Sequence, residues 1–189
     1  VVVVRLFNTV GPRQTGQYGM VVPRFVDAAI KNEPIEVHGD GTQSRCFGHV
    51  LDIVEGLSKL LATPQCLGQV INLGNDEETT ITQLAERAIA LTGSSSSLKY
   101  IPYSEAYGEG FEDMRRRVPS LDKAAKLVGY KPTRTLDDII NDVADELDET
   151  ALSRLFSVVL LLRQSAEIEL FVILDAFDQS LLIGDACAA

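Results

Sequence analysis

The first four residues, Val1 to Val4, are all β-branched and apolar, and they restrict the possible folds more than any other part of the chain. Strands that are apolar on both faces are typical of parallel sheets, which helices cover on both sides. The run has no initiator Met and no charged segment followed by a cleavage site, so it is not a signal peptide. A central parallel strand needs a neighbour on each side. We therefore expect the chain to be the back portion of a larger protein.

Short apolar runs alternate with segments of helical periodicity along the next 140 or so residues. Further strands are expected at residues 35–37, 70–73 and 98–101, with a tight Gly-Asp-Gly turn at 39–41. The helical pattern predicts helices over 22–30, from Asp52 with a buried face that includes Leu61, from Thr80 or Thr82 to Leu91, over about 120–128, and from Thr135 to Leu147. This alternation predicts an α/β architecture.

The composition excludes several classes of function. With 17 Lys+Arg against 27 Asp+Glu the net charge is −10, which disfavours a protein that binds the phosphate backbone of nucleic acids. The 3 cysteines are too few and too scattered for a disulfide framework or a zinc site, which favours a reducing, cytoplasmic location. The longest apolar stretch near the end, 158–162, is far shorter than the roughly 20 residues that cross a bilayer, so no membrane span is expected.

The pattern changes after Thr150, which suggests two regions, 1–150 and 151–189. Residues 155–162 and 170–174 are rich in Leu and Val, but neither segment has a clean helical or strand period. This apolar tail is unassigned. It would pack on the main body, cover a bare face, mediate oligomers, or have no consequence.

Three segments contain candidates for ligand binding. Asn8 follows the first strand, at the edge where open α/β sheets bind ligands, although an asparagine there is also a common turn residue. Arg45 follows the Gly-Asp-Gly turn and suits a phosphate oxygen, with a surface ion pair as the alternative. Arg115, Arg116 and Arg117 suit a pyrophosphate, but alternate side chains of an extended segment point in opposite directions, so at most two would face one ligand.

Other polar residues carry weaker signals. His38 and His49 lack metal-ligand spacing and are interpreted as structural or ligand-edge residues. Cys46 is interpreted as a buried, inert thiol. The sequence has no glycine-rich dinucleotide fingerprint and no Tyr-x-x-x-Lys, so it contains no recognisable redox machinery.

Together these segments resemble the C-terminal part of the extended short-chain dehydrogenase/reductase family, specifically its NAD-dependent nucleotide-sugar epimerases, dehydratases and decarboxylases. Five pieces match in order over about residues 1–147: RLFNTVGPR at 5–13, GMVVPRF at 19–25, VHGDGTQSR at 37–45 running on to Asp52, NLGN at 72–75, and RVPS with LVGYKP at 117–132. The resemblance implies an extended Rossmann-type α/β fold with its N-terminal NAD-binding half missing. Residues 1–150 would form the region that binds the nucleotide sugar.

The resemblance also implies roles for individual residues. Asn8 would contact the substrate near its phosphates or sugar, and Arg45 would hold the diphosphate. Val22 and Pro23 would lie beside the nucleotide, and Val37 and His38 would lie against the base. Either Arg115 or Arg117 would make a second contact with phosphate or ribose. Family members often have an aromatic residue where this chain has His38 and His49. They often have a tyrosine at the position of Val10 and an acidic residue at the position of Ser120.

The implied function is binding of a UDP- or dTDP-sugar for an NAD-dependent epimerase or dehydratase that transiently oxidises the sugar ring. A decarboxylase of the UDP-glucuronate type is an alternative, and so is a non-catalytic fragment or binding module that lacks the Rossmann half. The acid–base residues and the main NAD site would lie outside this chain. An exposed first strand would favour homo-oligomers or association through the sheet edge.

Overall fold

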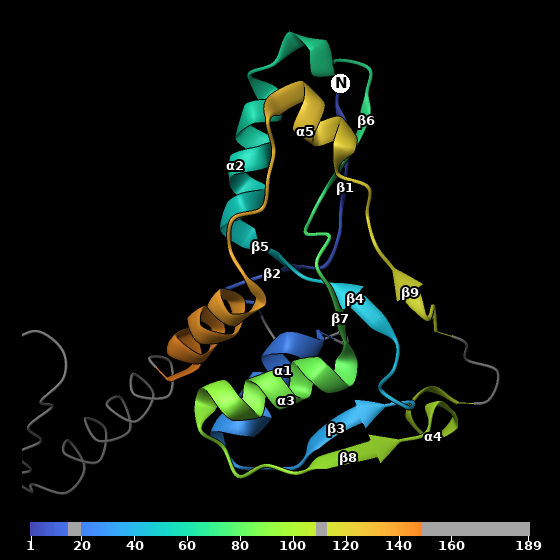
Figure 1. Cartoon of the computed structure of the whole chain (residues 1–189), viewed down its shortest axis with the longest axis vertical. Helices are drawn as coiled ribbons and strands as arrows, with labels where there is room; N and C mark the ends of the chain where they lie inside the picture. The colour runs from blue at the N-terminus through green and yellow to red at the C-terminus, as the bar shows by residue number, and fades with distance from the viewer. Residues whose placement is uncertain (15–19, 109–112, 149–189) are drawn as a thin grey trace, which may run out of the picture. The chain divides into compact units, whose positions relative to one another are not determined.

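The computed structural model describes residues 1–14, 20–108 and 113–148 (Figure 1). Its strands are short and mostly parallel. β1 (Val3–Leu6) pairs with β6 (Val70–Leu73), β2 (Thr9–Val10) with β5 (Gly48–His49), and β3 (Ile35–His38) with β8 (Leu98–Ile101), each in parallel. β4 (Ser44–Cys46) pairs antiparallel with β7 (Glu78–Thr80) and parallel with β9 (Arg116–Arg117). The α/β class expected from the sequence is confirmed.

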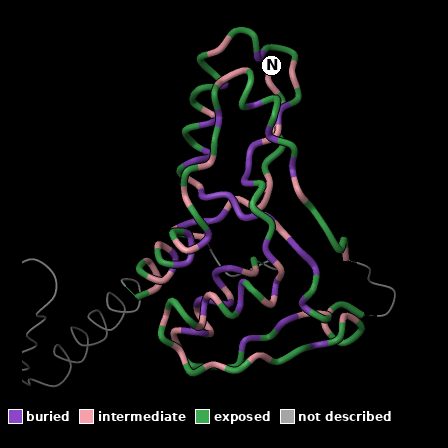
Figure 2. The backbone as a smooth tube through the Cα atoms, viewed as in Figure 1, coloured by how far each residue is buried: buried purple, intermediate pink, exposed green. Residues whose placement is uncertain are grey.

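The helices form around two apolar clusters. α1 (Val21–Ile30), α3 (Ile81–Thr92) and a helix at 136–148 pack with β3 around the first cluster. α2 (Val50–Leu61) and α5 (Asp122–Val128) pack with β1 and β6 around the second. Figure 2 shows buried backbone where α1 and α3 face each other. Two short elements, a 3₁₀ turn (Pro64–Cys66) and α4 (Tyr103–Tyr107), complete the described part.

Local sequence signals explain the helix ends. Thr80 and Gln83 form a reciprocal capping box at the start of α3, and Gly93 ends that helix at φ 63°. Gly129, at φ 64°, ends α5 in the same way. The expected role of Asp52 as the first cap of α2 is wrong, because the side chain of His49 caps that helix instead. Leu61, expected on the buried face, is 84% exposed.

The expectation that the first strand is buried on both faces is also wrong. Val2 and Val4 pack against the second cluster, but Val3 is 50% and Leu6 47% exposed. Among the described residues β1 pairs only with β6, so one edge and one face of this strand stay uncovered. The predicted tail, 151–189, lies outside the described residues, and the boundary at 150 stays a prediction.

The uncovered edge of β1 leads to a prediction about association. An exposed apolar parallel edge has free N–H and C=O groups that another chain can pair with. We expect the mass measured by light scattering to rise above that of the monomer with concentration. Val3→Lys, which places a charge on this strand, should reduce association, whereas Leu61→Lys on α2 should not. A monomer at every concentration would contradict this expectation.

Within the described residues, no helix combines the length and apolarity needed to span a membrane, and no group of His, Cys, Asp and Glu has the geometry of a metal site.

Candidate functional site

The turn between β3 and β4 leads from His38 to Arg45, which lies in β4. Gly39 and Gly41 adopt φ 78° and 72°, and a Cβ atom at Gly41 would collide with Thr82 Oγ1. The Asp40 carboxylate accepts hydrogen bonds from Thr42 Oγ1 (2.7 Å) and the Thr42 backbone N–H (2.9 Å), which also lower the pKa of Asp40. The tight turn expected from the sequence is therefore present.

Asn8 lies two residues after the end of β1, at the carboxyl end of the strand. It adopts φ 35°, and its Nδ2 donates to the carbonyl oxygen of Cys46 (2.9 Å). The turn interpretation is therefore correct, but Asn8 also lines a cavity. Its Oδ1 and the second hydrogen of its amide are not used by this contact.

That cavity brings together three of the candidates from the sequence. It has a volume of about 330 Å³, which is within the range of small-ligand sites. Asn8, His38 and Arg45 all line it, although they come from three separate segments. The rest of its lining is Val21, Arg24, Phe25, Glu36, Gln43, Phe47, Ile81, Tyr103, Tyr107 and Asp113.

Arg45 is held by several oxygen atoms. Its NH1 donates to the carbonyl oxygens of Ser44 and Met114, both at 2.7 Å. Its NH2 lies 2.6 Å from Oδ1 of Asp113, and the Arg45 side chain is only 14% exposed. This arginine is thus not the exposed surface ion pair of the alternative interpretation.

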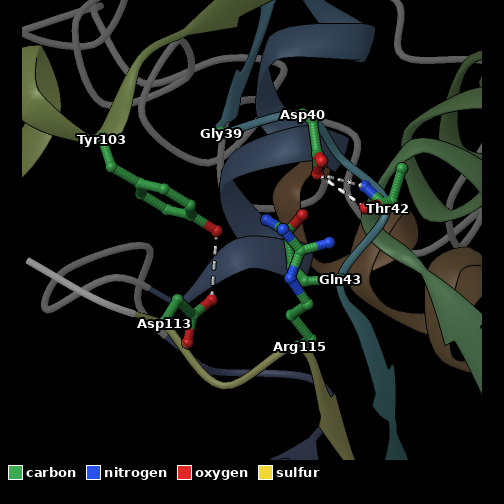
Figure 3. A pocket seen from close by; sticks show the side chains of 7 residues that line it. All are labelled: Gly39, Asp40, Thr42, Gln43, Tyr103, Asp113 and Arg115. Atoms are coloured by element: carbon green, nitrogen blue, oxygen red, sulfur yellow. Dashed lines mark hydrogen bonds between the residues drawn. The ribbon is translucent and has the colours of Figure 1, made fainter.

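A second cavity of about 510 Å³ adjoins the first and shares Gln43, Tyr103 and Asp113 with it. Figure 3 shows Arg115 and Gln43 between the Asp40–Thr42 turn and the Tyr103–Asp113 hydrogen bond. Gln43 is 7% exposed, and its Nε2 donates to the carbonyl oxygen of His38 (2.8 Å). Its buried Oε1 has no hydrogen-bond partner among the residues that the structure describes. A buried acceptor without a donor is unusual, so Gln43 is well suited to accept a hydrogen bond from a ligand.

His38 and Tyr107 form an aromatic pair at the rim of the first cavity. Nδ1 of His38 lies 2.9 Å from the Tyr107 hydroxyl, and the rings meet edge to face with centroids 5.2 Å apart. Burial, assisted by the charge of Arg24, lowers the pKa of His38, so its ring is mainly neutral at pH 7. A neutral ring of this kind can lie against a nucleobase.

Four predicted site residues lie outside both cavities. The side chains of Val22, Pro23 and Val37 are buried in the first apolar cluster or in α1. Their neighbours Val21, Arg24 and Glu36 line the first cavity instead. Arg117 lies over the ring of Phe7, 5.3 Å from its centroid, and Arg116 pairs with Glu78.

The structure adds Tyr103, Tyr107 and Asp113, which the sequence analysis did not single out. A signal was available for the tyrosines, since residues four apart share one face of a helix. Both lie on α4. Asp113 carried no such signal, because only the fold brings it to Arg45 over 68 residues.

Two of the weaker candidates are structural. His49 is fully buried; its Nδ1 accepts from Leu51 N–H, and its Nε2 lies 2.9 Å from Asp142. Cys46 is fully buried too, and burial raises the pKa of its thiol to about 11, which confirms an inert thiol.

Comparison with known proteins places this geometry in a family. Residues 1–74 match the NAD dependent epimerase/dehydratase family. The UDP-N-acetyl-alpha-D-glucosaminuronate decarboxylase of Bacillus cytotoxicus is 37% identical over 133 residues, which are 70% of this chain and 41% of the relative. UDP-glucuronic acid decarboxylase 1 of Danio rerio is 36% identical over 139 residues, 74% of this chain and 31% of the relative.

The UDP-glucuronic acid 4-epimerase of Bacillus cereus, solved with UDP-glucuronic acid and NAD, superposes with a TM-score of 0.70. It is 26% identical, and the match covers 79% of this chain and 45% of that one. Residues 1–74 of this chain belong to the NAD-dependent epimerase/dehydratase family. The chain spans less than half the length of these relatives.

NAD is the cofactor of the epimerase/dehydratase family. A dinucleotide pyrophosphate typically binds at a helix that starts from a glycine-rich turn after a strand. The helices α1 to α5 instead start after Met20, His49, Thr80, Pro102 and Leu121, and the helix at 136–148 starts after Thr135. The described part of the chain therefore does not provide that site for NAD.

Proposed function

We propose that this chain binds a nucleoside diphosphate-sugar, a UDP- or dTDP-sugar, as the substrate-binding portion of an NAD-dependent epimerase/dehydratase. The observation that carries the proposal is that Asn8, His38 and Arg45, from three distant segments, line one cavity. The free, buried thiols of Cys46 and Cys66 fit the reducing cytoplasm expected from the sequence.

The cavity offers suitable chemistry for each part of such a ligand. Aromatic and apolar groups at His38, Val21 and Phe25 suit a base. The guanidinium groups of Arg45 and, in the adjoining cavity, Arg115 suit the diphosphate. Asn8 and Gln43 can exchange hydrogen bonds with sugar hydroxyls.

The remaining predicted contacts fit less directly. Because the side chains of Val22, Pro23 and Val37 are buried, their proposed part in binding is to hold the neighbouring backbone and side chains beside the nucleotide. Arg117 is the second candidate, after Arg115, for the additional phosphate or ribose contact. The chain would supply binding energy and orientation for a reaction whose acid–base and redox groups lie elsewhere.

A second candidate is the substrate portion of a decarboxylase. Curated relatives from Bacillus, zebrafish and Arabidopsis, at 35–37% identity, are decarboxylases of UDP-linked uronic acids. A sugar carboxylate therefore belongs among the ligands to test. A binding module without catalysis would use the same cavity.

The proposal is tested by calorimetric titration of the folded full chain with UDP-glucuronate, UDP-glucose, dTDP-glucose and uridine. We expect heat with at least one nucleotide sugar, and about tenfold or more weaker binding of uridine, because uridine lacks the diphosphate. Preference for UDP-glucuronate over UDP-glucose would favour the decarboxylase candidate. No heat with any nucleotide sugar would overturn the proposal.

A further inference from the structure

Asp113 already binds the group that the proposed diphosphate site needs. Its Oδ1 lies 2.6 Å from NH2 of Arg45. Its Oδ2 accepts a hydrogen bond from the Tyr103 hydroxyl (3.2 Å), as Figure 3 shows. Asp113 lines both cavities, so this carboxylate lies where an anionic ligand would approach Arg45.

Within the described residues, the contacts of Arg45 occupy three of its five N–H donors. NH1 donates to the Ser44 and Met114 carbonyl oxygens and NH2 donates once to Asp113, so a further anion would bind the second hydrogen of NH2 or the Nε–H, beside the Asp113 carboxylate. A phosphate oxygen that binds NH2 meets the Asp113 carboxylate at the same guanidinium. The negative charges of the phosphate and of the Asp113 carboxylate repel each other when both bind one guanidinium group, and a partly buried site screens that repulsion poorly.

We propose that Asp113 is an internal competitor for the diphosphate: its carboxylate holds Arg45 and must release it when the nucleotide binds. The proposal rests on the proposed nucleotide-sugar function. It assigns Asp113 a role in setting the affinity for diphosphates as opposed to uncharged nucleosides. The charge of Asp113 already affects its neighbour, since burial and then this carboxylate raise the pKa of Tyr103 to about 12.

The competing interpretation is that Asp113 positions Arg45 for the ligand. The two interpretations predict opposite effects of the same substitution, Asp113→Asn, which removes the charge and keeps the shape. A competitor predicts tighter binding of UDP, by about tenfold, with uridine unchanged. A positioning residue predicts weaker binding of UDP.

The experiment is a calorimetric titration of the full chain and of Asp113→Asn with UDP, inorganic pyrophosphate and uridine. Glu78→Gln is the matched control, because Glu78 also pairs with an arginine, Arg116, at 2.9 Å, beside β4 but outside both cavities. Glu78→Gln changes the net charge by the same amount as Asp113→Asn and should alter the affinity for UDP by less than about twofold. Melting curves check that each variant is folded.

Tighter binding of UDP and pyrophosphate by Asp113→Asn alone supports the proposal. Unchanged or weaker binding by this variant overturns it and leaves the nucleotide-sugar function standing. An equal gain in Glu78→Gln also overturns it, because the effect is then one of net charge. Failure of both the unchanged chain and Asp113→Asn to bind UDP overturns both proposals.

Discussion

Replacing Arg45 by alanine is expected to weaken binding of UDP-glucuronate by about 100-fold and to leave binding of uridine within about twofold. The reason is that Arg45 lines the same cavity as Asn8 and His38, as Arg24 also does, and the Arg45 side chain is 14% exposed. Losing a charge-assisted hydrogen bond in a partly desolvated site costs far more than losing one at the surface. Titration calorimetry of the nucleotide and the nucleoside measures both effects.

Two further variants separate binding from folding. Arg45→Lys keeps the charge but cannot reach Ser44, Met114 and a phosphate at once, so we expect an intermediate loss. Arg87→Ala removes an arginine that pairs with Asp137 outside both cavities and should leave affinity unchanged. If Arg45→Ala and the unchanged chain bound UDP-glucuronate with equal affinity, Arg45 would not be part of the binding site.

Replacing Asp52 by asparagine is expected to lower the free energy of unfolding by about 3 kcal/mol. Asp52 is 2% exposed. Oδ2 accepts from the backbone N–H groups of Thr133 and Arg134, both at 3.0 Å. Oδ1 accepts from the Thr133 hydroxyl and from the Arg134 guanidinium. An asparagine would turn an N–H₂ group toward these donors. Urea denaturation measures the change.

The same carboxylate predicts a pH dependence. Burial raises the pKa of Asp52, but the hydrogen bonds from Arg134 and Thr133 outweigh it and leave the pKa below the usual value of an aspartate. A carboxyl whose pKa is lower in the folded chain stabilises it above the unfolded pKa, and this contribution disappears as pH falls through the folded pKa. Stability should therefore decline below about pH 4, and less steeply in Asp52→Asn.

Asp122→Asn is the control for Asp52, because Asp122 also lies in the first turn of a helix but is exposed. Within the described part of the chain its carboxylate accepts a hydrogen bond only from the Ser120 hydroxyl. We expect a loss of less than about 1 kcal/mol there. If Asp52→Asn and Asp122→Asn lowered the free energy of unfolding equally, the buried hydrogen bonds of Asp52 would not stabilise the fold more than those of an exposed aspartate.

The elements with strong local signals were predictable from the sequence. α3 carries its capping box at Thr80 and Gln83 and its stop at Gly93, and the structure places it at Ile81–Thr92. The helix expected over about 120–128 is α5, which ends at Gly129. These signals act within a few residues, so they do not depend on the rest of the fold.

Features set by distant contacts were not predictable. Four valines read as a buried strand, but burial depends on neighbours that the local sequence does not contain, and β1 is half exposed. His49 caps α2 in place of Asp52, which instead binds residues 133 and 134. The three consecutive arginines also make different contacts, which only the fold determines. Arg115 lines a cavity, Arg116 pairs with Glu78 and Arg117 lies over the ring of Phe7.

The candidate site shows the same division. The sequence proposed Asn8, His38 and Arg45 separately, and only the fold shows that they line one cavity. It did not indicate Asp113, because the contact with Arg45 spans 68 residues.

A crystal structure of this chain with UDP-glucuronate tests the central claim most directly. The account predicts the diphosphate in the cavity lined by Asn8, His38 and Arg45, with a phosphate oxygen within hydrogen-bond distance of the Arg45 guanidinium. A nucleotide bound on another surface, with this cavity empty, would contradict the account.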